Sequence, residues 1–208
     1  TVELKIFVGD LSDSDIVFEL YNWCKKKKLK INFLINNVGV GSDGSFISST
    51  ASFYLKQLNL NNNTTVLLTR LFYDNLKSCS PSFILNMSSL GAYQPIPFKS
   101  VYSASKTFIY YFSKAVGVEF KEQGIHVSVV LPGPVITNYN VLDRIERSGF
   151  LARKSVLTPE EVAKKTLLKV FKGYHVIIPG FLNKIIYLLS LLTPSKLKMY
   201  FITKEFRQ

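Results

Sequence analysis

The sequence predicts an α/β fold whose core is a doubly wound parallel sheet. Short apolar runs alternate with segments of helical period, and loops rich in Gly, Ser or Pro follow several of the apolar runs. Strands that are separated by helices of this length form βαβ units, in which neighbouring strands run parallel. The chain has 208 residues and shows neither internal repeats nor a linker, so we expect one domain over residues 1–208.

The N-terminal part predicts two strands with a helix between them. A strand over Val2–Val8 ends at Gly9, and Ile31–Ile35 is a short apolar strand of the kind that a parallel sheet buries on both faces. Ser12 to Ser14 supply the cap of the intervening helix. The residues expected on the buried face of that helix are Ile16, Val17, Leu20 and Trp23.

The rest of the chain continues the alternation. A loop at 38–49 precedes a long helix that runs through Val66–Phe72. The later strands are expected at Ser82–Met87, His126–Leu131 and Tyr174–Ile178, and the later helices at Val101–Gln123, from Thr158 onward and after Gly180. Ligands bind beyond the carboxyl ends of the strands in such sheets. The loops at 36–39, 88–91 and 132–137 each follow a strand, so we expect them to line one crevice.

Composition and charge exclude several classes of protein. Hydrophobic residues make up 47% and charged residues 19% of the chain, which excludes general disorder. No apolar run reaches the roughly 18 residues of an ordinary membrane-spanning helix. The net charge of +12 could attract nucleic acid or anionic lipid, but the lysines are scattered, and Lys25–Lys28 match a helix C-terminus. Because no nucleic-acid-binding motif is present, we expect no nucleic-acid partner.

Cysteines and histidines indicate neither disulfides nor a metal. Cys24 and Cys79 are too few for a disulfide framework and belong to no CxxC pattern, so we expect reduced thiols in a cytoplasmic protein. Because Thr1 leads directly into a strand-like run, we expect no signal peptide. His126 and His175 lie in apolar settings typical of structural residues, and no metal site is predicted.

A tyrosine–lysine pair carries the strongest chemical signal. Tyr102 and Lys106 are four residues apart, which places them on one helical face. A phenol with a pKa near ~10 is a poor acid or base at neutral pH until a nearby cation favours its anion. The pair therefore suits carbonyl–alcohol redox chemistry, in which a proton moves at oxygen while hydride moves at carbon.

With further motifs in the same order, the chain resembles the short-chain dehydrogenase/reductase family. The matching stretches are Asn36-Asn37-Val38-Gly39 (NNAG in the family), Met87-Ser88-Ser89 before Tyr102 and Lys106 (its serine and YxxxK), and Leu131-Pro132-Gly133-Pro134 with Thr137 (its PG segment). The resemblance covers Leu4 to Thr137. It implies a Rossmann-like sheet and an NAD- or NADP-dependent enzyme, similar to hydroxysteroid and ketoacyl reductases, that interconverts a ketone and a secondary alcohol on a hydrophobic small molecule. We also expect a homo-oligomer, with a dimer as its form.

The resemblance assigns a role to each matched residue. Tyr102 would give a proton to the substrate carbonyl in reduction and take it back in oxidation. Lys106 would lower the pKa of Tyr102 and bind the nicotinamide ribose, and Ser89 would hold the substrate oxygen. The full set implied to bind the cofactor is Asp10, Asn37, Gly39, Tyr102, Lys106, Pro132, Gly133 and Thr137.

Two of these assignments keep alternatives. The catalytic asparagine of the family's long helix could be Asn59, Asn61, Asn62 or Asn63. We choose Asn61, which stands eight residues before Thr69, the counterpart of a family threonine. Asp10 either caps the following helix or, as the resemblance implies, lies against the adenine ring.

The chain departs from the family at its beginning. The TGxxxGxG turn, whose glycines let the backbone reach the cofactor pyrophosphate, is absent, so we expect a sheet without the first two family strands. The sequence could belong to a longer polypeptide, the strand at Val2–Val8 could pair directly with Ile31–Ile35, or a partner chain could supply the missing strands. The residues that choose NAD or NADP are missing too, and only the basic net charge favours NADP.

Residues 138–208 are expected to follow a cofactor and catalytic core at 1–137 and to form a substrate lid with apolar C-terminal helices. Within the lid, Arg144, Arg147, Arg153 and Lys154 could meet an anionic substrate or be solvated. The run Ile185–Leu192 could pack on the body, join a dimer or lie on an anionic membrane as a peripheral contact. The alternative to an enzyme is a cofactor-deficient relative that acts as a scaffold or a membrane-surface module.

Overall fold

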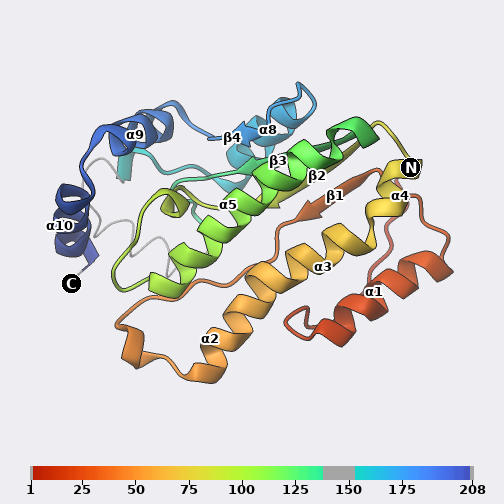
Figure 1. Ribbon diagram of the computed structural model, residues 1–208, viewed down its shortest axis with the longest axis horizontal. Coiled ribbons are helices and arrows are strands. Elements are labelled where there is room, and N and C mark those ends of the chain that lie inside the picture. Colours follow the sequence, from red (N-terminus) through yellow and green to blue (C-terminus); the bar gives the residue numbers. More distant parts are fainter. Residues whose placement is uncertain (1, 138–152, 207–208) are drawn as a thin grey trace.

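The computed structural model describes residues 2–137 and 153–206 and shows a parallel sheet with helices on both faces (Figure 1). The strands β1 (Phe33–Asn36), β2 (Ser82–Met87), β3 (Ile125–Val130) and β4 (Val176–Ile177) lie side by side in chain order. Each neighbouring pair is parallel. The predicted α/β, Rossmann-like fold class is confirmed.

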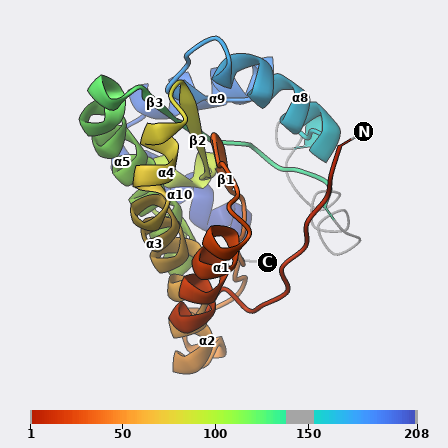
Figure 2. The same ribbon diagram turned by 90° about the vertical axis from the view of Figure 1, so that its right-hand side faces the viewer.

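The helices form two layers around this sheet. In chain order, the helices that precede β2 are α1 (Ser14–Lys26), α2 (Ala51–Leu58), α3 (Thr64–Leu71) and α4 (Tyr73–Ser78). The helices that follow β2 in the chain are α5 (Ser100–Phe120), α8 (Pro159–Val170), α9 (Phe181–Leu192) and α10 (Ser195–Phe206). Short 3-10 turns lie at η1 (Phe46–Ser48), η3 (Leu90–Tyr93) and η4 (Lys121–Gln123). Figure 2 shows α1, α3 and α5 on one side of the strands and α8 on the other.

Strand β2 holds the two layers together because successive side chains of a strand point to opposite faces. Ile84 packs with Val17 of α1 and Leu68 of α3. The next residue, Leu85, packs on the other face with Val170 of α8 and Ile177 of β4. Residues 82 and 84–86 are all buried, as expected for an interior parallel strand.

Strand β1 differs from the prediction because it lies at the edge of the sheet. Among the described residues it pairs with β2 alone. Ile35, expected to be buried, is 49% exposed, whereas Asn36 at the end of the strand is buried. The apolar run marks the strand correctly, but burial on both faces would need a further covering element beside it.

The strand predicted at Val2–Val8 is wrong. The segment is extended but joins no ladder of the described sheet, and Figure 2 shows it running apart from the strands on its way from the N-terminus to α1. Val2, Leu4, Ile6 and Val8 are each at least 71% exposed. Phe7 is held by a ring contact, with its centroid 5.8 Å from that of Trp23 in α1. The segment does not pair with β1 either, so this alternative is also contradicted.

Two helices differ locally from their predicted forms. Asp13, between the predicted caps Ser12 and Ser14, is the N-cap of α1, and its carboxylate accepts a hydrogen bond from the Asp15 amide at 2.9 Å. On the predicted face of α1, Val17 is fully buried, while the other three residues are half-buried. The long helix predicted through Val66–Phe72 is divided in the structure. A π-helical turn, η2 (Asn59–Asn63), joins α2 to α3, and α4 follows α3 as a separate helix.

Within the described parts of the chain, no helix combines the length and apolar character needed to cross a bilayer.

Two matched isoleucine substitutions test this description of the core. Ile84→Ala should lower the free energy of unfolding by roughly 2–5 kcal/mol, because it removes a fully buried side chain and leaves a cavity. Ile6→Ala should change it by less than about 0.5 kcal/mol, since Ile6 is 71% exposed. Urea unfolding followed by circular dichroism measures both values. A cost at Ile6 as large as that at Ile84 would mean that the N-terminal segment is packed into the fold.

Candidate active site

The site lies where the carboxyl ends of β1, β2 and β3 meet the N-terminal half of α5. Contacts join the loops after β2 and β3 there and link α5 to the end of β2. Leu90 in the loop after β2 donates its amide to the Pro132 carbonyl after β3 at 3.0 Å. The Lys106 ammonium of α5 donates to the carbonyl of Met87, the last residue of β2, at 3.0 Å.

Lys106 is the most unusual group of this site because its ammonium is buried. The residue is only 6% exposed, and no carboxylate of the described residues forms an ion pair with it. Burial lowers the pKa of Lys106 from 10.5 to about 8, since a charged amine loses its hydration. An ammonium has three donors, and the described residues give this one a single hydrogen-bond acceptor, the Met87 carbonyl. The group can therefore donate to a ligand.

Tyr102 lies one helical turn before Lys106, on the same side of α5. The Lys106 Nζ atom is 5.9 Å from the centroid of the Tyr102 ring, and the ring is half-buried. The loop after β1 approaches the ring closely, because a Cβ atom at Gly41 would lie 3.9 Å from two of its carbons. The predicted pair thus faces the strand ends together.

Gly39 and Asn61 complete the surroundings of the ammonium. A Cβ atom at Gly39 would lie 3.1 Å from Asn61 Oδ1 and 3.3 Å from Lys106 Nζ, so the glycine backbone rests over both side chains. Asn61 Oδ1 accepts from the Val40 amide at 2.8 Å, and its Nδ2 donates to the Val40 carbonyl and to Ser105 Oγ, both at 3.0 Å. The π-helical turn η2 holds Asn61 in this position, buried against α5.

The other asparagines of η2 have different partners. Asn62 donates to the Ser105 carbonyl at 2.9 Å, while Asn63 donates to Asn59 at 2.8 Å on the exposed side. Asn61 is thus the member of this group that the structure brings against Gly39, beside the Lys106 ammonium.

A buried polar chain beneath the site was missed by sequence reasoning. Asn36 Nδ2 donates to Asn86 Oδ1 at 2.8 Å, and Asn86 Nδ2 donates to Ser113 Oγ at 2.9 Å. The chain joins β1, β2 and α5, and Asn36 Oδ1 has no partner among the described residues. The available signal was an asparagine near the end of each of two neighbouring apolar strands. Asn37, the predicted cofactor contact, is exposed beside it.

The two serines after β2 have separate surroundings. Ser88 is buried, and its hydroxyl donates to the Lys106 carbonyl at 2.7 Å. Ser89 is half-exposed, and its Oγ accepts from the Gly91 amide at 3.1 Å at the start of η3. Among the described residues no acceptor for the Ser89 hydroxyl proton is found, so Ser89 has a donor to offer and Ser88 has not.

The turn after β3 packs against α9. A Cβ atom at Gly133 would lie 2.2 Å from Asn183 Oδ1, so a side chain at this position would collide with α9. Pro132 is half-buried and Thr137 is exposed at the last described position before 153. Of the charged residues predicted in the lid, Arg144 and Arg147 lie outside the described residues, whereas Arg153 and Lys154 are exposed.

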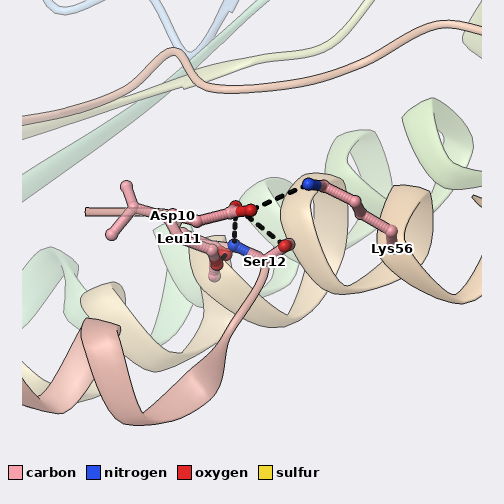
Figure 3. A network of polar contacts seen from close by, with 5 residues as sticks. Asp10, Leu11, Ser12 and Lys56 are labelled. Carbon is pink, nitrogen blue, oxygen red and sulfur yellow. Dashed lines mark hydrogen bonds and ion pairs between the residues drawn. The ribbon is translucent and has the colours of Figure 1, made fainter.

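Asp10 lies away from this cluster, in an exposed polar network (Figure 3). One carboxylate oxygen accepts from the Ser12 amide at 3.0 Å and from its hydroxyl at 2.8 Å, and the other pairs with Lys56 of α2 at 2.8 Å. Lys56 first and then Ser12 lower the pKa of Asp10 to about 2. Asp10 is not the cap of α1, since Asp13 has that role.

The described residues fit one end of a nicotinamide nucleotide. The ammonium donors of Lys106 and the backbone at Gly39, with no side chain, form a polar surface that a ribose and its hydroxyls could contact. The 208 residues contain no glycine-rich pyrophosphate turn. No cluster of three metal-ligating side chains occurs in the described ranges, and His126 and His175 lie together with hydrogen bonds to backbone carbonyls.

Comparison with known proteins identifies the family. A family model of the short chain dehydrogenases matches residues 1–146, and the chain belongs to this family. Mouse 17-beta-hydroxysteroid dehydrogenase type 3 is 33% identical over 193 residues, which cover 88% of this chain and 59% of that protein. Very-long-chain 3-oxoacyl-CoA reductase of Anas platyrhynchos is 31% identical over 150 residues, 69% of this chain and 47% of that protein. The chain thus spans about half of these relatives' length.

Solved structures share the fold. A structure described in work on 7beta-hydroxysteroid dehydrogenase stereoselectivity covers 97% of this chain with a TM-score of 0.81 at 20% identity, and the match takes in 77% of that chain. A short-chain dehydrogenase from Sphingobium yanoikuyae in complex with NADPH covers 82% of this chain and 65% of its own, with a TM-score of 0.69 at 22% identity.

The burial of Lys106 predicts a pH-dependent stability. The folded-state pKa of about 8 lies below the ordinary 10.5, so below pH 8 the folded protein bears the full cost of the buried charge. Between pH 8 and 10.5 that cost disappears, and the wild type should gain about 3 kcal/mol relative to Lys106→Met. Denaturant unfolding on either side of this window, at pH ~7 and at pH ~11, measures the difference.

Lys114→Met is the matched control, because Lys114 lies two turns later on α5 and is exposed. Its stability relative to the wild type should stay constant over the same pH range. A constant difference for Lys106→Met as well would show that the Lys106 amine is hydrated.

Proposed function

We propose that the protein is an NAD(P)-dependent oxidoreductase that interconverts a ketone and a secondary alcohol on a hydrophobic small molecule. The observation that carries this proposal is the buried Lys106 ammonium, 5.9 Å from the Tyr102 ring and beneath the Gly39 backbone. Membership of the short chain dehydrogenase family supports it. The activity is proposed for the whole protein, since its relatives are longer than this chain.

Tyr102 is the proposed proton donor and acceptor at the substrate oxygen. In this proposal the Lys106 cation stabilises the Tyr102 phenolate, which would lower the pKa of the phenol. In reduction Tyr102 donates its proton to the carbonyl oxygen, and in oxidation it takes the proton from the alcohol. When bound, the nicotinamide supplies or accepts the hydride at carbon.

The remaining site residues are proposed to position the reacting groups. Lys106 would hold the nicotinamide ribose with the ammonium donors that face away from Met87. Ser89 would donate its hydroxyl proton to the substrate oxygen, because Ser88 already donates to the helix backbone. Asn61 would keep the Gly39–Val40 backbone against Lys106 through its hydrogen bonds to Val40.

The proposed cofactor set also includes Asn37, Pro132, Gly133, Thr137 and Asp10. The first four follow β1 and β3, at the strand ends that border the site. Asp10 would have to contact adenine beside its ion pair with Lys56. The net charge of +12 favours NADP, the nucleotide with the additional phosphate, over NAD.

The names of two relatives give probes for the substrate. Hydroxysteroids and 3-oxoacyl-CoA are the substrates that those names state. In both classes the carbonyl or hydroxyl is attached to an apolar part of the molecule, the steroid rings or the acyl chain, which agrees with a hydrophobic substrate here.

A non-enzymatic role is the second candidate, and one observation favours it. The outer edge of β1 is not paired within the described residues, and Val2, Leu4, Ile6 and Val8 of the N-terminal segment are exposed. A chain that cannot bind the nucleotide would act as an interaction module instead.

Replacing Tyr102 by Phe tests the enzymatic proposal. The substitution removes only the proton-transferring hydroxyl, so turnover of an oxosteroid or a 3-oxoacyl-CoA with NADPH or NADH should fall by roughly 10²–10⁴-fold. The near-ultraviolet absorbance of the reduced nucleotide follows the reaction.

Tyr111→Phe is the matched control, because Tyr111 is 64% exposed on the same helix and should retain full turnover. Normal turnover by Tyr102→Phe would refute the proposed role. A folded wild-type chain that binds neither nucleotide in calorimetric titration would support the interaction module.

A homo-oligomer is also proposed, on the basis of an apolar stripe along α5. Phe108, Tyr111 and Val118 are 46%, 64% and 77% exposed, and their spacing of three and seven residues puts them on one face. An exposed stripe of this kind on a long helix suits a contact with a second copy.

Light scattering after size-exclusion chromatography tests the oligomer. The wild type should elute as a dimer, and Tyr111→Glu with Val118→Glu should shift it to the monomer mass, because two charges would be buried in the contact. Val8→Glu is the control, since Val8 is 90% exposed and lies outside α5. A wild type that is monomeric at all tested concentrations would contradict the proposal.

A further inference from the structure

Helix α9 exposes its apolar side to solvent. Along its 12 residues, the strongly exposed apolar side chains are Phe181, Leu188, Leu189, Leu191 and Leu192, at 55–82% exposure. At about 100° per residue these positions fall within one half of the helix surface, and Lys184 is the charged residue among them. Surface helices of globular proteins normally turn this side inward, so the face calls for an apolar environment.

The opposite side of α9 is firmly attached to the body of the protein. Asn183 is 1% exposed and donates to the Ser155 and Pro179 carbonyls, both at 3.0 Å. It also fills the space above Gly133. The Tyr187 ring lies 4.3 Å from the ring of Tyr93 in η3, the turn that begins at Ser89. The apolar face is therefore held outward by a fixed inner face.

The charge around this face is predominantly positive. Between residues 172 and 204 the sequence contains five lysines and no acidic residue. Lys184 on α9 and Lys196 and Lys204 on α10 are exposed, and α10 begins three residues after α9 ends, at the same end of the molecule (Figure 1). Lys184 also lies near Lys169 of α8, where burial and then the Lys184 amine lower the pKa of Lys169. An anionic partner fits this surface.

We propose that α9 docks in the plane of a lipid bilayer that contains anionic lipids, with its leucines among the acyl chains and the lysines of α9 and α10 at the headgroups. A helix of 12 residues is about 18 Å long, too short to cross a hydrocarbon core of about 30 Å. It can lie along the interface, where an apolar face combined with nearby lysines is the typical arrangement. Each cation near the anionic headgroups strengthens binding.

A second copy of the chain fits this face less well than lipid does. In a two-fold symmetric contact the same patch meets itself, so Lys184 and the neighbouring lysines of one copy would meet a patch whose charges are again lysines. Like charges brought together in an interface weaken association. An anionic bilayer satisfies both the leucines and the lysines.

The docking has a consequence that rests on the proposed function. The inner residues Asn183 and Tyr187 contact the Gly133 turn and η3, two of the loops around the candidate site. Docked through α9, the protein would hold these loops one helix away from the lipid, where an apolar ketone or alcohol accumulates.

Vesicle flotation of the 208-residue chain tests the docking without any assay of turnover. Binding should be at least about tenfold stronger to phosphatidylcholine vesicles with roughly 30% phosphatidylserine than to phosphatidylcholine alone, and it should weaken at high salt. Lys184→Gln with Lys196→Gln should weaken binding roughly 25-fold, about fivefold for each lysine. Leu188→Gln with Leu192→Gln should weaken it about tenfold or more.

Matched controls distinguish vesicle binding through the α9 face from nonspecific adsorption. Lys25→Gln with Lys26→Gln removes two exposed lysines from α1, and Leu4→Gln with Val8→Gln removes two exposed apolar residues from the N-terminal segment. Both controls should bind as the wild type does, and circular dichroism should show every variant folded. Equal loss in the controls, or no preference for the anionic vesicles, would overturn the proposal. The proposal would also be overturned if the wild type did not bind vesicles but formed a dimer, and if Leu188→Gln with Leu192→Gln dissociated that dimer.

Discussion

The buried ammonium of Lys106 is the constraint around which the candidate site is organised. Removing a cation from water is expensive, and the described residues offer it the Met87 carbonyl but no carboxylate. The packing of α5 offsets this unfavourable free energy, because its Ile109 and Val116 are buried in apolar clusters shared with β3. A helix fixed this firmly can keep a charged group where an isolated helix would let it reach solvent.

The same helix explains why the surrounding loops have so little freedom. The Lys106 carbonyl accepts the Ser88 hydroxyl, and the Lys106 ammonium limits what can stand at Gly39. Ser113, two turns further along, ends the polar chain that starts at Asn36. One helix thus sets the positions of the loops after β1 and β2, and its lysine would lose its role if α5 shifted by one residue.

The sequence predicted the interior of the fold better than its edges. The bounds of β2 were predicted to the residue and those of β3 within one residue, because both are mostly apolar segments that are largely buried. Val2–Val8 has an equally apolar run but no neighbour to receive its hydrogen bonds, so a local pattern could not predict its state. The asparagines at 59–63 marked a break in the long helix that its apolar period concealed.

For the site, the motif spacing predicted which residues meet but not what each contacts. The fold brings Tyr102, Lys106, Gly39 and Asn61 together, although their roles in a reaction stay predictions. Adjacent serines look alike in a sequence, and only the α5 backbone distinguishes the engaged Ser88 from Ser89. The Asn36–Asn86 pair depends on strand register, which sets those two residues opposite each other and which no single segment encodes.

The exposed apolar surfaces at β1 and at α9 differ in their chemistry. At β1 the exposed group is a strand edge that has no second neighbour among the described residues, with Ile35 beside it, a surface that another strand would complete through hydrogen bonds. At α9 the backbone is satisfied within the helix, and only side chains, leucines with lysines, face outward. An added strand would not neutralise the lysine charges, and lipid acyl chains would not form hydrogen bonds with a strand edge. The two surfaces therefore require different occupants, and occupying one leaves the other exposed.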